Sequence, residues 1–415
     1  MFSFDRKFLL NFGSLNFSSF LNKLISFVYV TLLVRLLPQS AFGIYSLVWA
    51  HLGLLNAWQD LGTTSYGLLQ GKADNYKTLN NIFSLRLLLS VAVAFGTILA
   101  SFLFKYDFSV SLVIICFAGL FAFSALSGFY LVLNSLNKTL YKSSALSVVF
   151  NVFLIAVNIS LLLWTKDIYL LLKITAFSYL GFAFVLLFLI RQTFPQLKFS
   201  LNKTILKKVI QRSAIFSLIS FLASLYFKMD FIILNHFHGS KALGVYSAGY
   251  KFFEVPLLMV ANYNFSSLPT FKRLYKENFE LYKQKIAKDS LFLLLLATLV
   301  ILGTLGVGQF VIGTIFSQKY LAAVPVLYIL IFTLPFILLS SVFLNALYAQ
   351  RKEKYVLALF SCVLLFNLIS NYLFIPKYGY LGAAKITVLT ELFGSIIFGA
   401  YLLYNLRKPH VKNRN

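Results

Sequence analysis

Long apolar stretches alternate with short polar links along almost the whole chain. A helix that crosses a membrane needs about 20 mostly apolar residues. Cutting the sequence at its charged and turn-rich links gives twelve stretches of that length, approximately 10–36, 41–67, 82–104, 109–134, 144–164, 169–190, 213–235, 242–267, 290–316, 322–348, 355–375 and 382–405. The pattern predicts an all-α integral membrane protein with twelve transmembrane helices.

Composition supports a membrane protein. Hydrophobic residues make up 60% of the 415 residues, charged residues only 12%, and the mean hydropathy is +0.82. A soluble domain has about a quarter of its residues charged. These values exclude a soluble enzyme, a secreted disulfide scaffold and a coiled coil. Cys116 and Cys362 lie far apart in apolar stretches, so we expect two buried thiols.

The chain carries 37 Lys and Arg against 12 Asp and Glu, a formal net charge of +25. Such a balance is typical of nucleic-acid binding, but most of the basic residues lie in short links between apolar stretches. Of the 37, 26 fall on one side of the predicted membrane and 7 on the other. Cytoplasmic links are richer in Lys and Arg, so both termini are predicted in the cytoplasm. The basic segment 203–212 fits an amphipathic helix on the inner leaflet or a solvated linker equally well.

Two segments of the chain resemble each other. FGIYS at 42–46 matches LGVYS at 243–247, and KIT at 173–175 matches KIT at 385–387. Repeats in the same orientation are typical of secondary transporters whose substrate path lies between two halves. We therefore expect two six-helix halves, 1–195 and 213–406, joined by a basic cytoplasmic linker, 196–212, and followed by a tail, 407–415.

Several polar and charged residues lie inside the predicted spans, where each charge costs about 2.5–3.5 kcal/mol and normally faces a cavity. Polar residues recur every three to four positions in the first span and again in the seventh, which indicates two walls of one cavity. The intramembrane candidates are Asn16, Lys23, Arg35, Asn56, Asp60, Arg86, Lys228, Asp230, Lys251, Glu254, Lys385 and Glu391. Cations exceed anions modestly, which favours an anionic ligand such as phosphate. The carboxylates fit internal ion pairs and ion coupling equally well, and Arg35 and Arg86 are near enough to membrane edges to reach the interface instead.

Motifs for enzyme chemistry are missing from the sequence. It has no Gly-x-x-x-x-Gly-Lys-[Ser/Thr] loop for a nucleotide, and no Gly-x-Ser-x-Gly elbow for a nucleophile. His236 and His238 flank Phe237 without a nearby Cys or carboxylate, which is a weak metal pattern. We expect no enzyme activity, no metal site and no cofactor, so the energy for any work comes from a gradient, of H⁺ or Na⁺, or from a partner.

Short motifs follow one another along these spans. They are Arg35-Leu36-Leu37-Pro38, Phe42-Gly43-Ile44-Tyr45, Asp60-Leu61-Gly62, Lys228-Met229-Asp230, Leu243-Gly244-Val245-Tyr246-Ser247-Ala248, Leu268-Pro269, Asn367, Asn371, Ile375-Pro376, Gly379 and Gly382-Ala383-Ala384. In this order and on twelve spans, the motifs resemble those of the polysaccharide repeat-unit flippases (O-antigen or capsule type) of the MATE-like exporter superfamily, and the resemblance covers nearly the whole chain. Lys385 and Pro38 depart from the small residue and the glycine expected at those two places.

The resemblance implies a flippase that moves a polyprenyl-diphosphate-linked oligosaccharide to the outer leaflet of a prokaryotic cytoplasmic membrane by alternating access. A polysaccharide polymerase and chain-length machinery are the expected protein partners. For diphosphate and sugar we expect contacts with Lys23, Arg86, Lys228 and Lys251, together with Asn16 and Asn56. The expected coupling or charge-pair residues are Arg35, Asp60, Asp230, Glu254 and Glu391.

Other functions remain open at the level of sequence. A cation-coupled multidrug exporter of the MATE type shares the fold but favours an acidic cavity. A lipid II flippase relative normally has fourteen spans, and a polymerase or ligase carries a long outer loop, whereas the outer links here are short. A scaffold that organises an assembly complex without transporting is a further alternative.

Overall fold

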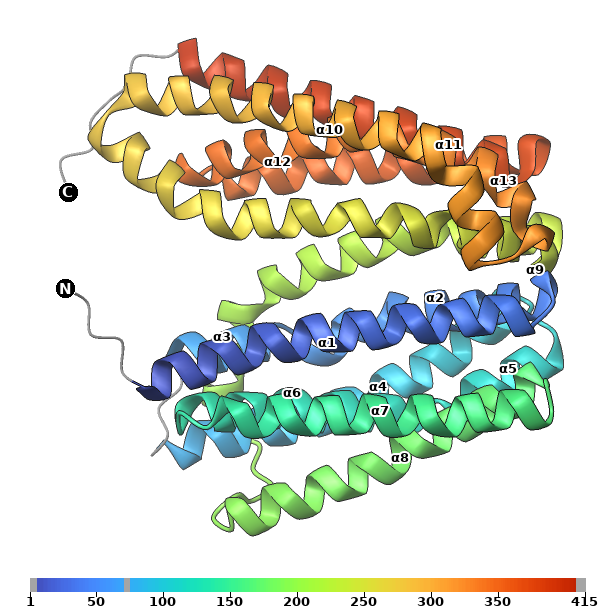
Figure 1. The fold of residues 1–415 in the computed structure, drawn as a ribbon. Coiled ribbons are helices and arrows are strands. Elements are labelled where there is room, and N and C mark those ends of the chain that lie inside the picture. The colour runs from blue at the N-terminus through green and yellow to red at the C-terminus, as the bar shows by residue number, and fades with distance from the viewer. Residues whose placement is uncertain (1–5, 71–74, 408–415) are drawn as a thin grey trace. The chain divides into compact units, whose positions relative to one another are not determined.

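A computed structural model gives the fold (Figure 1). It describes residues 6–70 and 75–407, leaving aside the side chains of 6–16, 57, 65, 68–70, 212–216, 261 and 265. Within these residues the regular elements are all helices. The chain divides into two compact units, Met1–Lys228 (unit one) and Met229–Asn415 (unit two). Each unit is described by itself.

Most of the helices lie in unit one. In chain order they are α1 (Arg6–Leu36), α2 (Gln39–Asp60), α3 (Thr63–Gln70), α4 (Tyr76–Leu103), α5 (Phe108–Cys116), α6 (Ala118–Leu136), α7 (Leu140–Trp164) and α8 (Ile168–Thr193). α9 (Lys203–Glu277) begins in unit one and continues into unit two. Unit two also holds α10 (Phe279–Ile315), the 3₁₀ helix η1 (Gln318–Ala323), α11 (Val324–Ile331), α12 (Leu334–Ala349) and α13 (Glu353–Arg407).

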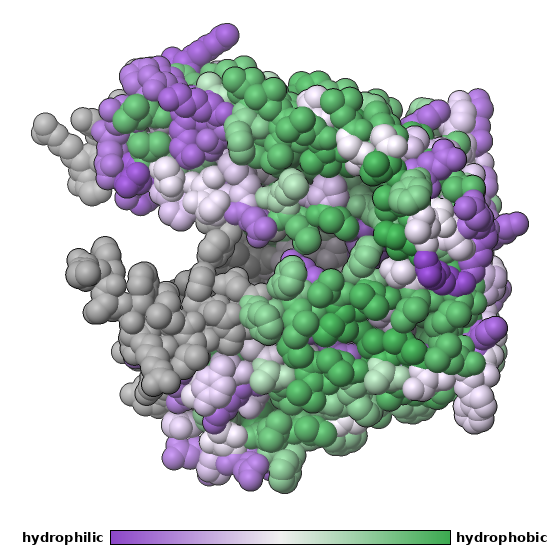
Figure 2. All heavy atoms as spheres, viewed as in Figure 1, coloured by the Kyte–Doolittle hydropathy of each residue, from purple (hydrophilic) through white to green (hydrophobic). Residues whose placement is uncertain are grey.

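Nine helical segments in the described part of the chain are long and apolar enough to cross a membrane. They cover eleven of the twelve predicted stretches, because α9 and α13 each contain two of them. The remaining stretch, 41–67, is divided between α2 and α3. On the face that Figure 2 shows, apolar residues cover the middle of the helices and hydrophilic residues gather at helix ends. The chain is a multi-pass membrane protein.

The predicted span 41–67 is broken at Leu61 and Gly62, so it is wrong as a single helix. Both residues have positive φ, 43° and 68°, and they separate α2 from α3. A glycine adopts this backbone region without steric cost and commonly ends a helix. Because of the break, Asp60 lies at the C-terminal end of α2, and Thr64 belongs to a different helix.

The two long helices α9 and α13 each bend at a glycine with non-helical geometry, Gly239 and Gly379. In α13, Pro376 has no backbone N–H, and the turn at Gly379 releases the carbonyl of Ile375 from the helical ladder. His238 Nε2 lies 2.8 Å from that oxygen. The two bends of unit two are therefore in contact, and His238 has a structural partner.

The predicted basic linker, 196–212, is held against α4. Backbone amides of 198, 200 and 202 donate to the side chains of Asn80, Ser84 and Asn81 at 3.0, 2.7 and 2.6 Å respectively. α9 then starts at Lys203. Its Val209 is fully buried in the core of unit one, whereas the lysines of the same stretch are exposed. The prediction that both cysteine thiols are buried is wrong, because Cys116 is half-buried and Cys362 is exposed.

A close helix approach in unit two provides a stability test. A Cβ added at Gly249 of α9 would lie 2.9 Å from Ala323 O and 2.9 Å from Val326 Cβ. We expect Gly249→Ala to destabilise the protein by about 1–2 kcal/mol, because overpacking costs more than the helix propensity that alanine adds. The control is Gly303→Ala, which meets no atom within 4 Å and should be neutral or stabilising. Thermal unfolding in detergent measures both, and equal effects would contradict the close approach.

Candidate functional site

Arg86 of α4 is a buried charge of unit one with several hydrogen-bond partners. Its side chain is 3% exposed, and its Nη1 lies 2.5 Å from Asp60 Oδ1. Nη1 also donates to the hydroxyls of Thr63 and Thr64 at 3.0 and 2.8 Å. Nε donates to the carbonyl of Ala125 on α6 at 2.9 Å. The guanidinium therefore joins the α2–α3 break to α4 and α6, and we call these residues the Arg86 clamp.

The break between α2 and α3 supplies the acceptors of this clamp. The hydroxyl of Thr63 donates to the Asp60 carbonyl at 2.6 Å, and both the amide and the hydroxyl of Thr64 donate to Asp60 Oδ1 at 3.1 and 2.7 Å. A Cβ at Gly128 of α6 would overlap the guanidinium, at 2.1 Å from Nη2. Only glycine leaves room there. Arg86 is thus fixed inside the fold by a carboxylate, two hydroxyls and a carbonyl.

A second polar group lies between α1 and α7. Asn22 donates to Ser147 at 3.0 Å and accepts from Asn151 at 3.0 Å. Lys23 is the next residue of α1 and is exposed. Such side-chain hydrogen bonds hold helices together where no water is present. The asparagine pair accounts for part of the polar stripe in the first span and places Lys23 beside it.

Lys228 lies against α2 in unit one. The position of a Cβ at Gly53 would be 3.9 Å from Lys228 Cε. Gly53, Asn56 and Asp60 recur at three- and four-residue steps, so they share one face of α2. Asn56 is exposed and Lys228 half-buried. Lys228 is the last residue of α9 that belongs to unit one. It therefore places a cation beside the face of α2 that runs from Gly53 to the Arg86 clamp.

Unit two has its own cluster of ionisable groups. Asp230 is buried. Its Oδ2 accepts a hydrogen bond from Tyr246 OH at 2.6 Å, and its Oδ1 accepts one from the backbone N–H of Phe231 at 2.9 Å. Lys251 Nζ lies 2.7 Å from Glu254 Oε2, and both side chains are about one third exposed. Asp230, Glu254 and Glu391 all interact electrostatically with buried Tyr250. These three carboxylates therefore lie near enough to one buried phenol to act on it, and Lys251 pairs with one of them, Glu254.

The structure brings together some predicted site residues and not others. Asp60 with Arg86, and Glu254 with Lys251, are ion pairs, as the charge-pair alternative for the carboxylates requires. Arg35 is exposed near the end of α1. The side chain of Asn16 lies outside the described residues. Ligand contacts and ion coupling stay predictions for all of these residues.

Sequence reasoning missed several partners of the buried charges. Thr63 and Tyr246 belong to hydrogen-bond networks whose acidic members were recognised. His51 also has partners, since its ring nitrogens lie 2.9 Å from Thr97 O and 3.3 Å from Tyr106 OH. Burial raises the pKa of Tyr106, which keeps its hydroxyl protonated as a donor. A hydroxyl three residues after an intramembrane Asp was the available signal for Thr63, but nothing local indicated the others.

Comparison with solved structures identifies the fold. An inward-facing multidrug resistance MATE family transporter of the MOP superfamily matches with a TM-score of 0.73 at 15% identity, over 93% of this chain and 94% of that one. The lipid II flippase MurJ in an inward closed conformation also gives 0.73, at 14% identity over 95% of this chain and 87% of that one. At such identities the likeness concerns the fold. The chain has the membrane fold of the MOP superfamily.

The family follows from the sequence comparison. A family profile described as "Polysaccharide biosynthesis protein" matches residues 8–275, and the chain belongs to that family. An uncharacterized membrane protein of Methanocaldococcus jannaschii is 24% identical over 73% of this chain and 61% of its own length. The capsular polysaccharide biosynthesis protein CapF of Staphylococcus aureus is 29% identical over 40% of this chain and 42% of its own length. The matches therefore span less than two thirds of these relatives.

Proposed function

We propose that this protein is a flippase that translocates a polyprenyl-diphosphate-linked oligosaccharide across the prokaryotic cytoplasmic membrane for surface polysaccharide biosynthesis. The family match over residues 8–275 carries the proposal. The relative named for capsular polysaccharide biosynthesis supports it, as does the fold shared with a lipid II flippase. A charged sugar cannot cross hydrocarbon unaided, so transport needs a polar path through the protein.

The proposed arrangement has twelve spans in two six-helix halves, 1–195 and 213–406, with both termini in the cytoplasm. The bends of α9 and α13 support it, because each long helix becomes two spans when divided at its glycine. The pairs α2 with α3, α5 with α6, and α11 with α12 each count as one interrupted span. Alternating access then moves the substrate between the halves.

In this proposal Lys23, Lys228 and Lys251 contact the diphosphate, and Asn16 and Asn56 contact sugar. Lysine and arginine are the usual partners of phosphate oxygens. The donors of Arg86 already bind Asp60, Thr63, Thr64 and Ala125. We therefore place Arg86 as a group that fixes the α2 face on which Asn56 lies.

The proposed coupling uses an H⁺ or Na⁺ gradient and no bound cofactor. Glu254 is the leading proton carrier because its partner Lys251, 2.7 Å away, is also a proposed phosphate ligand. Protonation of Glu254 removes the competing carboxylate and leaves Lys251 for the substrate. Glu391 is the second candidate carrier, whereas Arg35, Asp60 and Asp230 are charge-pair residues. A polysaccharide polymerase and chain-length machinery are the proposed partners.

Translocation in proteoliposomes tests the function. Vesicles hold only this protein and a lipid-diphosphate-linked oligosaccharide, and an external enzyme reports sugar that reaches the outer leaflet. We expect exposure that depends on an imposed H⁺ or Na⁺ gradient. If the folded protein exposed no sugar at the outer leaflet with any of several lipid-linked oligosaccharides, under either gradient, that result would contradict the proposal.

A cation-coupled multidrug exporter is the second candidate, favoured by the fold shared with MATE transporters. The same vesicles loaded with cationic dyes separate the two. Dye movement without movement of the lipid-linked sugar would establish the exporter. The excess of intramembrane cations over anions opposes binding of a cationic drug.

A further inference from the structure

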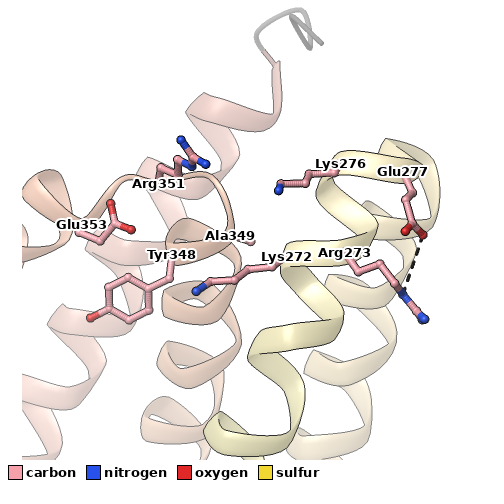
Figure 3. A pocket seen from close by; sticks show the side chains of 8 residues that line it. All are labelled: Lys272, Arg273, Lys276, Glu277, Tyr348, Ala349, Arg351 and Glu353. Carbon is pink, nitrogen blue, oxygen red and sulfur yellow. Dashed lines mark ion pairs between the residues drawn. The ribbon is translucent and has the colours of Figure 1, made fainter. Parts of the chain in front are cut away.

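A charged pocket lies where three helix ends of unit two meet. It has a volume of about 470 Å³ between the C-terminal ends of α9 and α12 and the N-terminal end of α13. Its lining residues are Lys272, Arg273, Lys276, Glu277, Tyr348, Ala349, Arg351 and Glu353 (Figure 3). This pocket lies outside the polar groups already described, and no step of the proposed transport uses it.

Three cations of this pocket face one gap. Figure 3 shows Lys272 and Lys276, one turn apart on α9, reaching toward the α12–α13 turn that carries Arg351. Among the described residues, no carboxylate lies within ion-pair distance of these three side chains. Arg273 points away and pairs with Glu277 at 3.9 Å. The gap therefore concentrates positive charge that the described protein does not neutralise in ion pairs.

The backbone at Arg351 is held in an unfavourable conformation. Its φ is +58°, and the amides of 351 and 352 bond the carbonyls of Tyr348 and Leu347, each at 3.1 Å. This is the Schellman pattern at the end of α12, where glycine is the favoured residue. A β-carbon there costs free energy. The turn thus places Arg351 in the lining of the pocket, with the same positive φ that Lys105, Lys138 and Lys166 adopt after other helices.

The charges at the helix ends offset only part of the positive charge of the three cations. Each C-terminus of α9 and α12 carries about half a negative charge, and the N-terminus of α13 about half a positive one. Glu353 adds one negative charge at the first turn of α13. Against three cations, a net charge of roughly one to two remains, which suits one phosphate ester.

The geometry points to a phosphate-ester site in this pocket, occupied by the headgroup of an anionic membrane phospholipid. Basic pockets between helices at the cytoplasmic face bind such headgroups. Here α9 and α12 end and α13 begins, each next to a long apolar stretch. Lys272 and Lys276 would approach from α9 and Arg351 from the opposite turn, so the phosphate would join two helices. This inference does not depend on which substrate the protein transports.

Binding to the full-length protein in neutral detergent tests the site. Native mass spectrometry compares phosphatidylglycerol with zwitterionic phosphatidylcholine on the wild type and on the combined variant Lys272→Gln, Lys276→Gln, Arg351→Gln. We expect the wild type to prefer phosphatidylglycerol about tenfold or more and the variant to lose that preference. The control variant Lys105→Gln, Lys166→Gln, Lys241→Gln removes the same charge from exposed residues of the predicted outer links and should keep it.

The outcomes separate the alternatives. Equal losses in both variants, or an unchanged preference in the pocket variant, would overturn the site. In a thermal-shift experiment, protection by phosphatidylglycerol but not by inorganic phosphate assigns the site to lipid. Equal protection by 10 mM inorganic phosphate, as an approximate working concentration, would assign the same phosphate chemistry to a soluble ligand instead.

Arg351→Gly distinguishes binding from a structural role. Glycine relieves the positive φ, so this variant should unfold at a temperature about 1–2 °C higher while binding phosphatidylglycerol several-fold more weakly. A residue with only a structural role would not combine higher stability with weaker binding. Retained lipid binding in this variant and in the triple variant would contradict the proposal.

Discussion

Replacing Asp60 with leucine will destabilise the protein by about 3–5 kcal/mol, because it leaves the guanidinium of Arg86 buried without a counter-charge. The side chain of Arg86 is 3% exposed, so water cannot replace the lost carboxylate. Arg86→Met should cost less, since the Asp60 side chain is 34% exposed and keeps the Thr64 amide and hydroxyl as donors. The thermal unfolding midpoint in detergent, with a denaturant titration, measures both variants.

The double variant gives the sharper test of the clamp. We expect Asp60→Leu with Arg86→Met to be more stable than Asp60→Leu alone, because an apolar pair avoids the isolated buried charge. A matched cycle on Lys251 and Glu254 serves as the control, since that pair is about one third exposed on both sides. Its coupling energy should stay below about 1 kcal/mol. Similar coupling energies in the two cycles would contradict a special role for burial at Arg86.

Much of the fold follows from the sequence because apolar length and positive-residue position are local properties. The apolar stretches and their links reproduce the helix bounds of α4, α7, α8 and α10 within a few to about a dozen residues. Continuity is a different property. The break at Leu61 and Gly62, inside one predicted stretch, depends on backbone geometry with positive φ, as do the bends at Gly239 and Gly379, which fall between predicted stretches. Hydropathy does not record backbone geometry.

The candidate site was predictable to the same degree. Periodicity placed Asp60 and Arg86 on helix faces, and charge suggested that each carboxylate has a cationic partner. The sequence pattern could not show that Asp60 pairs with Arg86, 26 residues away. Nor could it show that Arg86 also donates a hydrogen bond to Ala125 O. Lys251 and Glu254 were easier because residues three apart on one helix necessarily adjoin. Contacts within one helix could be predicted, and contacts between helices could not.

Neutralising the three proposed phosphate ligands should abolish translocation. The variant Lys23→Gln, Lys228→Gln, Lys251→Gln removes three charge-assisted contacts, each worth about 1.5–3 kcal/mol. We expect initial rates of sugar exposure in proteoliposomes to fall at least 100-fold, and single variants to fall about tenfold. Lys228→Arg, which keeps the charge, should retain much of the rate. Rates are compared at equal amounts of folded protein, judged by a monodisperse elution profile.

A matched control removes the same charge elsewhere. Lys105, Lys166 and Lys241 are exposed residues of the predicted outer links, and their combined change to glutamine should leave the rate within about twofold. Glu254→Gln should instead make transport independent of a proton gradient, because the side chain beside Lys251 is then permanently neutral. If the three-lysine variant transports at the control's rate, these lysines do not bind the substrate. If Glu254→Gln keeps full dependence on the gradient, the proton carrier lies elsewhere, and Glu391 is the next residue to change.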